Sequence, residues 1–129
     1  IGPDGHSDAD VLLHAICDAI LGAAGLRDIG FHFPNTSDEF KDADSRNLLA
    51  DVMTLIKDKG YNVGNIDATL VSEVPKISPY ISDIKASISS LCNLADDEVG
   101  VKATTSETVG FVGRREGIEA YAVVLLEKQ

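Results

Sequence analysis

Hydrophobic residues repeat with helical spacing in three segments of this chain and alternate with a period of two in three others. The helical segments run from about Asp8 to Ala24, with Gly25 as the expected stop, from about Ser45 to Gly60, and onward from Ser78-Pro79, where Ser78 is expected as the N-cap. The strand segments are Asn65 to Ser72, Glu98 to Thr104 and Ile118 to Glu127. Three strands are few for three helices, so we expect a further strand or hairpin before Ile1.

Length and charge limit the classes of protein that fit. The 129 residues, 44% of them hydrophobic, suit one domain, 1–129, with a buried core. A net charge of −10 and 5% aromatic residues argue against a nucleic-acid partner, and no apolar run is long enough for a membrane span. Cys17 and Cys92 lie in apolar helical contexts and are predicted to be buried free thiols in a reducing compartment.

The first candidate site lies at the start of the first helix. Ser7 is predicted to cap this helix, with Asp10 completing a capping box. Asp10, His14 and Asp18 are spaced four residues apart and share one helix face, which suits a bound cation. Asp18 is further expected to accept a hydrogen bond from the His14 ring. Alternatively, this is a solvated acidic face that happens to carry a histidine.

A second candidate site follows the second strand. Thr104, Thr105, Ser106 and Glu107 precede a glycine-containing loop that ends at Arg114. Hydroxyls, backbone N–H groups and a guanidinium together suit a phosphate clamp, to which Glu107 would add a hydrated divalent ion. The alternative is an ordinary hairpin loop.

Two weaker candidates lie in connections. In Glu73-Val74-Pro75-Lys76, a lysine at a strand end is placed for a phosphate or a base edge, unless it is a plain surface lysine. The polar connection from Arg27 to Asp44 is long enough to be functional, and its Asp28-Ile29-Gly30 turn offers a carboxylate and an N–H. His32 in this connection is interpreted as a partly packed loop residue.

No motif for a protein nucleophile was found, which favours chemistry in which the protein positions and neutralises phosphates, with metal assistance. In their order and spacing, the segments resemble the 2-C-methyl-D-erythritol 2,4-cyclodiphosphate synthase family. The matching pieces are His6-Ser7-Asp8-Ala9-Asp10 with His14, Asp28-Ile29-Gly30 with Phe33-Pro34, Pro75-Lys76, Lys102-Ala103-Thr104-Thr105 with Glu107, and Gly110-Phe111 with Gly113-Arg114.

The resemblance implies an α+β fold, with a mixed β-sheet packed by helices in a βαβ arrangement, that assembles as a homotrimer with active sites between subunits. It implies a phosphorus–oxygen lyase of non-mevalonate isoprenoid biosynthesis that converts 4-diphosphocytidyl-2-C-methyl-D-erythritol 2-phosphate to the 2,4-cyclodiphosphate and CMP. The substrate's own 2-phosphate attacks its β-phosphorus. The implied location is the bacterial cytoplasm, or the plastid stroma in a eukaryote.

The resemblance also implies roles for individual residues. His14 would be a ligand of a Zn²⁺ site, and Glu107 would hold Mg²⁺ or Mn²⁺ at the diphosphate. His6 and Thr105 match positions that steady the transition state. The implied substrate contacts are His6, Ser7, Asp28, Gly30, Phe33, Pro34, Asn35, Thr36, Ser37, Ser72, Glu73, Val74, Pro75, Lys76, Ile77, Ser78, Thr104, Thr105, Ser106, Glu107, Phe111 and Arg114.

One part of the family pattern is not in this sequence. The family completes its Zn²⁺ site with an Asp-x-His motif in an N-terminal strand, and we expect that segment to precede Ile1. Two other functions stay open: a metal-dependent phosphodiesterase that uses water, and a non-catalytic trimeric protein that binds cytidine nucleotides and metal.

Overall fold

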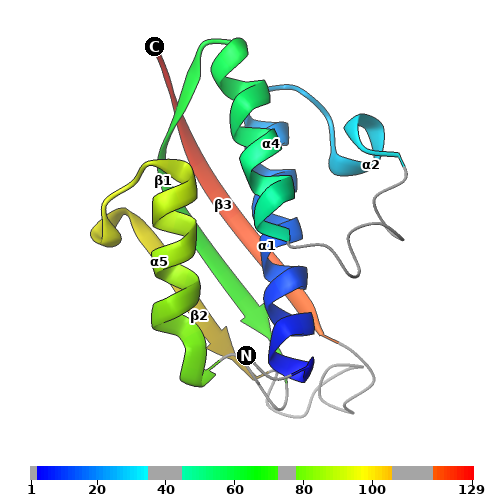
Figure 1. Cartoon of the computed structure of the whole chain (residues 1–129), viewed down its shortest axis with the longest axis vertical. Helices are drawn as coiled ribbons and strands as arrows, with labels where there is room; N and C mark the ends of the chain where they lie inside the picture. Colours follow the sequence, from blue (N-terminus) through cyan, green and yellow to red (C-terminus); the bar gives the residue numbers. More distant parts are fainter. Residues whose placement is uncertain (1–2, 35–44, 73–77, 106–117) are drawn as a thin grey trace.

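The computed structural model describes residues 3–34, 45–72, 78–105 and 118–129, which form one layer of helices on one mixed β-sheet (Figure 1). The elements are α1 (Pro3–Ala23), α2 (Ile29–His32), α4 (Ser45–Asp58), β1 (Tyr61–Val71), a 3-10 turn (Ser78–Tyr80), α5 (Ile81–Cys92), a second 3-10 turn (Asp96–Glu98), β2 (Val99–Thr104) and β3 (Glu119–Lys128). The mixed sheet and helix packing confirm the predicted α+β fold class.

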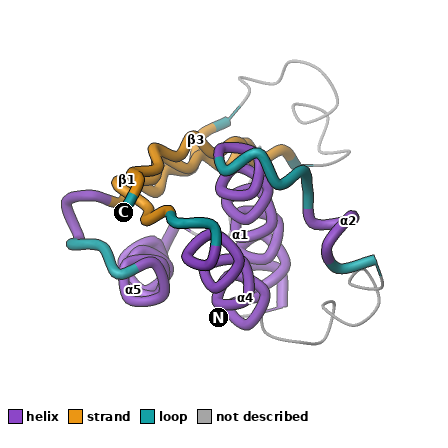
Figure 2. Tube along the Cα trace, turned by 90° about the horizontal axis from the view of Figure 1, so that it is seen from above, coloured by secondary structure: helices purple, strands orange, loops and turns teal. Residues whose placement is uncertain are grey.

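The sheet has the strand order β2-β1-β3. β1 and β2 are parallel and are connected through α5, as a βαβ unit requires, whereas β3 runs antiparallel to β1. A bulge interrupts the β1–β3 register between Val63 and Asn65. Figure 2 shows α1, α4 and α5 together on one side of this sheet.

α1 supplies the centre of the core because it lies against both the sheet and α4. Its fully buried side chains recur every three or four residues: Leu12, Ile16, Cys17, Ile20 and Leu21. Leu48, Leu49, Val52 and Ile56 of α4 and Ile84 and Ile88 of α5 complete the layer. Full burial of one such leucine or isoleucine side chain stabilises the fold by about 1.5–3 kcal/mol.

Left-handed residues end the long helices. Gly25, predicted as the stop of α1, has φ 71°, and Leu26 N–H donates to Leu21 O at 2.8 Å in a Schellman arrangement. Asn93 ends α5 in the same way, with φ 55°. At the end of α1, Lys59 Nζ also donates to Ala24 O at 2.5 Å, which joins the C-terminal ends of α1 and α4.

The structure corrects several predicted boundaries. α1 begins at Pro3, where a missing N–H costs little, so Ser7 lies inside the helix and is not its N-cap. The Asp10 carboxylate accepts from Ser45 Oγ at 2.5 Å rather than completing a capping box. Ser78 and Pro79 open a 3-10 turn before α5, and Tyr80 takes the N-cap position of that helix.

Two further corrections concern segment lengths. Part of the predicted 27–44 connection forms α2, while residues 35–44 lie outside the described ranges. β1 begins at Tyr61, four residues before the predicted start, because the bulge lets the chain continue pairing with β3.

The sheet face opposite the helices is largely exposed. Alternate side chains of β3 point to it, and Tyr121, Val123 and Leu125 are 57%, 72% and 58% exposed. Lys102 and Asp67 form an ion pair on the same face. Within the described ranges, no helix combines the length and apolarity that crossing a membrane requires.

Candidate active site

The first group of candidate residues lies where β1 and β2 end. Because these strands are parallel, Ser72 and Thr104 meet there, and Ser72 N–H donates to Thr104 O at 2.9 Å. Ser72 is buried, whereas Thr104 and Thr105 are exposed. α1 begins at this same end of the sheet (Figure 1), and His6 and Ser7 lie in its first two turns.

His14 occupies the middle of α1 and is half-buried. Its Nε2 is buried, and no group among the described residues lies within hydrogen-bonding distance of it. An unpartnered buried imidazole nitrogen is costly, so this atom suits a ligand that the described residues do not supply. Among those residues, no group of three histidine, cysteine or carboxylate side chains is arranged to hold a metal ion.

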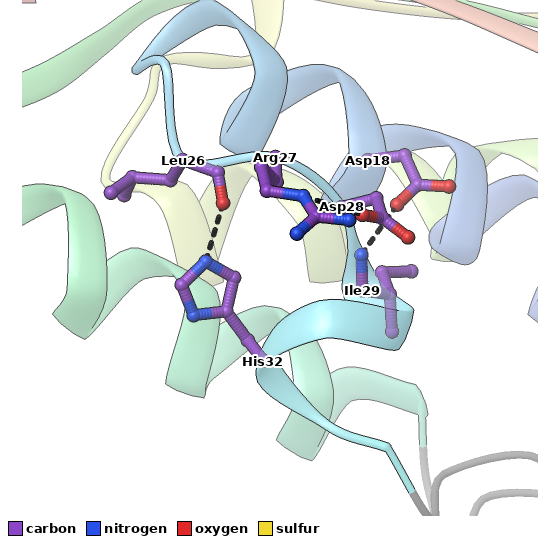
Figure 3. Close-up of polar contacts among 6 residues, drawn as sticks. All are labelled: Asp18, Leu26, Arg27, Asp28, Ile29 and His32. Carbon is purple, nitrogen blue, oxygen red and sulfur yellow. Dashed lines mark hydrogen bonds and ion pairs between the residues drawn. The ribbon is translucent and has the colours of Figure 1, made fainter.

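Asp18 does not have the expected partner. Its Oδ1 accepts from Ile29 N–H at 2.9 Å, at the start of α2 (Figure 3), and not from the His14 ring. The Asp10 and Asp18 carboxylates on either side of His14 therefore contact the starts of α4 and α2, respectively.

The second group of candidate residues lies on and around α2. Asp28 is the N-cap residue of this helix, but its side chain makes no cap hydrogen bond, and Arg27 Nε lies 3.9 Å from its Oδ1. A Cβ added at Gly30 would come within 3.2 Å of Asp28 Oδ2, so the glycine leaves room for that carboxylate. Phe33 is half-buried and packs against the core, and Pro34 is exposed.

Neither cysteine belongs to a site. Cys17 and Cys92 are buried free thiols, as predicted. Burial raises the pKa of Cys92 to about 12 and raises the pKa of Cys17 further above its usual range, with Cys92 and Asp18 adding to the shift at Cys17. Because thiolate is the form that binds metal or attacks an electrophile, neither side chain is suited to those roles near neutral pH.

The candidate residues thus fall into two groups on one chain, which we call the candidate half-sites: one at the strand ends and one at α2 beside the C-terminal half of α1 (Figure 1). His14 lies along α1 between them. The side chains of His6 and Ser7 are not described, and the remaining candidates lie outside the described ranges: Asn35, Thr36, Ser37, Glu73, Val74, Pro75, Lys76, Ile77, Ser106, Glu107, Phe111 and Arg114.

Two residues in and next to α2 make contacts that the sequence pattern did not indicate. His32 Nε2 lies 2.5 Å from Leu26 O, and the Arg27 guanidinium lies 4.4 Å from the centre of the Phe31 ring. His32 is half-buried, which confirms the predicted partial packing, but it lies in α2 and not in a loop. Its carbonyl partner has no sequence signal. The Arg-x-x-x-Phe spacing is the one feature that could have indicated the cation–π contact.

The fold and the candidate residues together describe a small α+β domain with hydroxyl residues at parallel strand ends. The helix that begins at this end carries an imidazole nitrogen with no partner among the described residues. The chain belongs to the YgbB family, whose model matches residues 1–127.

Proteins with similar sequences share one name, which is consistent with the family assignment. A protein of Cytophaga hutchinsonii called 2-C-methyl-D-erythritol 2,4-cyclodiphosphate synthase is 55% identical over 127 residues, which cover 98% of this chain and 80% of that protein. A protein of the same name from Methylobacillus flagellatus is 59% identical over 127 residues, covering 98% and 79% of the two chains.

Solved structures share the fold. The bifunctional IspDF from Campylobacter jejuni superposes with a TM-score of 0.85 at 38% identity, over 92% of this chain and 32% of that one. A CDP complex of IspF from Plasmodium falciparum has a TM-score of 0.79 at 35% identity, over 92% and 71% of the two chains.

Proposed function

We propose that this chain catalyses the cyclisation of 4-diphosphocytidyl-2-C-methyl-D-erythritol 2-phosphate to 2-C-methyl-D-erythritol 2,4-cyclodiphosphate, with release of CMP. The observation that carries this function is the agreement of relatives at 53–59% identity over nearly the whole chain, all named as this synthase. In the reaction, a 2-phosphate oxygen bonds to the β-phosphorus, and the bond from that phosphorus to the CMP phosphate breaks.

The arrangement suits a reaction that needs positioning rather than a protein nucleophile. Both reacting phosphates belong to one substrate, so the protein's task is to fold that substrate and neutralise its charge. We assign the cytidine and diphosphate end to the strand-end half-site with Ser72–Ser78, and the erythritol end to Asp28 and Gly30. The CDP complex of the Plasmodium falciparum relative supports a cytidine ligand.

We propose His14 as one ligand of a divalent metal, with Zn²⁺ the expected ion, and Glu107 as a ligand of Mg²⁺ or Mn²⁺ at the diphosphate. The Nε2 of His14 is buried and has no partner in the described part of the chain, which fits a metal ligand. One imidazole does not make a tight site, so the other ligands come from outside the described residues. A divalent ion bound there supplies neutralisation of phosphate charge, which matters in a chain of net charge −10.

We further propose a homotrimer with active sites between subunits. Two features support it: the apolar row of Tyr121, Val123 and Leu125 on the exposed sheet face, and a candidate site divided into two half-sites. Contiguous exposed apolar patches mark interaction surfaces. The proposed location is the bacterial cytoplasm, or the plastid stroma in a eukaryote, with no nucleic-acid or membrane partner.

Phosphorus NMR of the authentic substrate, incubated with the intact protein and Mg²⁺, tests the activity. We expect two coupled cyclic diphosphate signals and an equivalent of CMP, both abolished by chelator. An open monophosphate product would instead indicate the phosphodiesterase, and nucleotide binding without turnover would indicate the non-catalytic binding protein. The relatives favour neither of these alternatives.

Metal content tests the role of His14 separately. His14→Ala should lower the metal bound per chain at least tenfold, measured by elemental analysis after dialysis, since structural and catalytic ligands each contribute strongly to affinity. His32→Gln is the matched control, because the His32 ring already contacts the Leu26 carbonyl in the wild type. This variant should bind as much metal as the wild type.

A further inference from the structure

α2 is a helix of one turn, and it is fixed by contacts from outside itself. Its first N–H, from Ile29, donates to Asp18 Oδ1 of α1 at 2.9 Å (Figure 3). Four residues is too short for a helix to persist in water on its own, so the conformation of this segment depends on such contacts.

Because Asp18 accepts from the first N–H of α2, Asp28 is not needed to cap this helix. Asp28 takes the N-cap position of α2 with an extended backbone, φ −140° and ψ 173°, and an aspartate there ordinarily accepts from the first N–H groups. Here its side chain makes no cap hydrogen bond, and the carboxylate of Asp18 accepts from the helix instead. The Asp28 side chain, 57% exposed, is therefore not used to hold its own helix.

The other end of α2 is fixed by His32. The distance from its Nε2 to Leu26 O is 2.5 Å, and because a carbonyl only accepts, the ring nitrogen must be the donor. Leu26 itself belongs to the Schellman arrangement that ends α1. Both ends of the turn that carries Asp28 and Gly30 are thus connected to α1, one through a side chain and one through the helix end.

Arg27 lies between α1 and α2 and has an unfavourable backbone conformation. It lies in the left-handed region with φ 75°, which is unfavourable for a residue with a side chain, and its guanidinium lies over the Phe31 ring. This bend turns the chain from the end of α1 into α2.

We propose that Asp18 and His32 are positioning residues that hold the Asp28 carboxylate and the Gly30 backbone in place for the substrate, without contacting it themselves. The inference rests on the proposed function, which assigns Asp28 and Gly30 to the erythritol end. It assigns Asp18 to α2 and not to the metal, although Asp18 follows His14 by one helical turn.

A double-mutant cycle in the intact protein tests the proposal. Asp18→Ala should raise KM about tenfold with kcat nearly unchanged, and the Kd for CMP should stay within twofold, since CMP is assigned to the other half-site. Asp18→Asn keeps an oxygen that accepts from Ile29 N–H and should recover most of the loss. In the Asp28→Ala background, Asp18→Ala should raise KM less than about twofold, because the effect of Asp18 acts through Asp28.

Asp58→Ala is the control for a lost surface charge, since Asp58 is an exposed residue at the end of α4, and it should leave KM unchanged. Amide hydrogen exchange gives a readout independent of turnover. Exchange at Ile29 should accelerate at least tenfold in Asp18→Ala and stay at the wild-type rate in Asp58→Ala. For His32, the matched pair is His32→Ala, which should raise KM, and His32→Gln, whose amide retains a donor.

The proposal would be overturned if Asp18→Ala raised KM equally with and without Asp28. An unchanged KM or an unchanged exchange rate at Ile29 in Asp18→Ala would also overturn it. A metal content that falls in Asp18→Ala as it does in His14→Ala would also overturn it. A wild-type protein without turnover would contradict the proposed function alone, because the exchange experiment would still decide whether Asp18 holds α2.

Discussion

At the scale of single residues, the absence of a Cβ at Gly30 leaves room for a neighbouring carboxylate. The space a Cβ would need lies 3.2 Å from Asp28 Oδ2, and that oxygen belongs to the side chain assigned to the substrate. The φ of Gly30 is not in the left-handed region, so alanine fits the backbone and meets only the carboxylate.

Gly30→Ala should therefore change ligand binding more than stability. Alanine favours helix by up to about 1 kcal/mol over glycine, so the free energy of unfolding should not fall. Displacement of the Asp28 carboxylate should lower kcat/KM about tenfold. Thermal melting and steady-state kinetics of the same sample check both. A large fall in melting temperature would show that Gly30 serves the fold instead.

The two thiols are predicted to be inert in the folded protein. The raised pKa values of Cys17 and Cys92 mean that both stay protonated as pH rises through the usual thiol range, because the buried thiolate is disfavoured. Alkylation with iodoacetamide at pH 8, followed by mass spectrometry, should modify neither residue in the native state and both in denaturant. Rapid native labelling of either one would contradict its burial.

At the scale of elements, the ends of the helices depend on partners far away in the sequence. Lys59, just beyond α4, donates to the last turn of α1, where C-terminal carbonyls lack partners within the helix. The bond joins residues 35 positions apart.

Lys59→Met keeps the aliphatic stem and removes this donor, and it should lower the free energy of unfolding by about 1 kcal/mol. Lys57→Met is the matched control, an exposed lysine of α4 itself, and should change it by less than about 0.5 kcal/mol. Urea titration of the two variants beside the wild type compares them, and equal effects would argue against a specific role for the bond.

Local patterns predicted the three long helices and the three strands, but they predicted neither α2 nor the partners of the elements. The apolar stripes of α1 and α4, the stop at Gly25 and the alternation of β1 each depend on neighbours within a few residues. The Asp10–Ser45 and Asp18–Ile29 contacts depend on tertiary packing, so local signals were attributed to a capping box and to the His14 ring. The candidate substrate residues were assigned mainly through family resemblance, since a turn such as Asp-Ile-Gly has no distinctive physical pattern.

At the scale of the whole molecule, the exposed sheet face is the feature most at odds with a monomer. Val123 is 72% exposed in the middle of β3, between Tyr121 and Leu125. An apolar side chain at such a position gains stability only when another surface covers it.

Val123→Glu should dissociate the proposed trimer at micromolar concentration, because a carboxylate cannot be buried there without a partner. Sedimentation velocity or light scattering would measure the mass. Gln129→Glu, a change of equal charge at an exposed position beyond β3, is the control and should leave the assembly intact. A wild-type monomer would contradict the trimer, and a mass unchanged by Val123→Glu would place the interface elsewhere.

The contact between α1 and β3 has a consequence for synthesis on the ribosome. Among the described elements, α1 is synthesised well before β3, yet α1 packs directly against that strand. Until residues 119–128 have left the exit tunnel, Leu12, Ile16 and their neighbours lack part of their native cover. Between the synthesis of α1 and that of β3, the nascent chain therefore presents an apolar helix, and we expect chaperones that hold exposed hydrophobic segments to engage it until β3 has emerged.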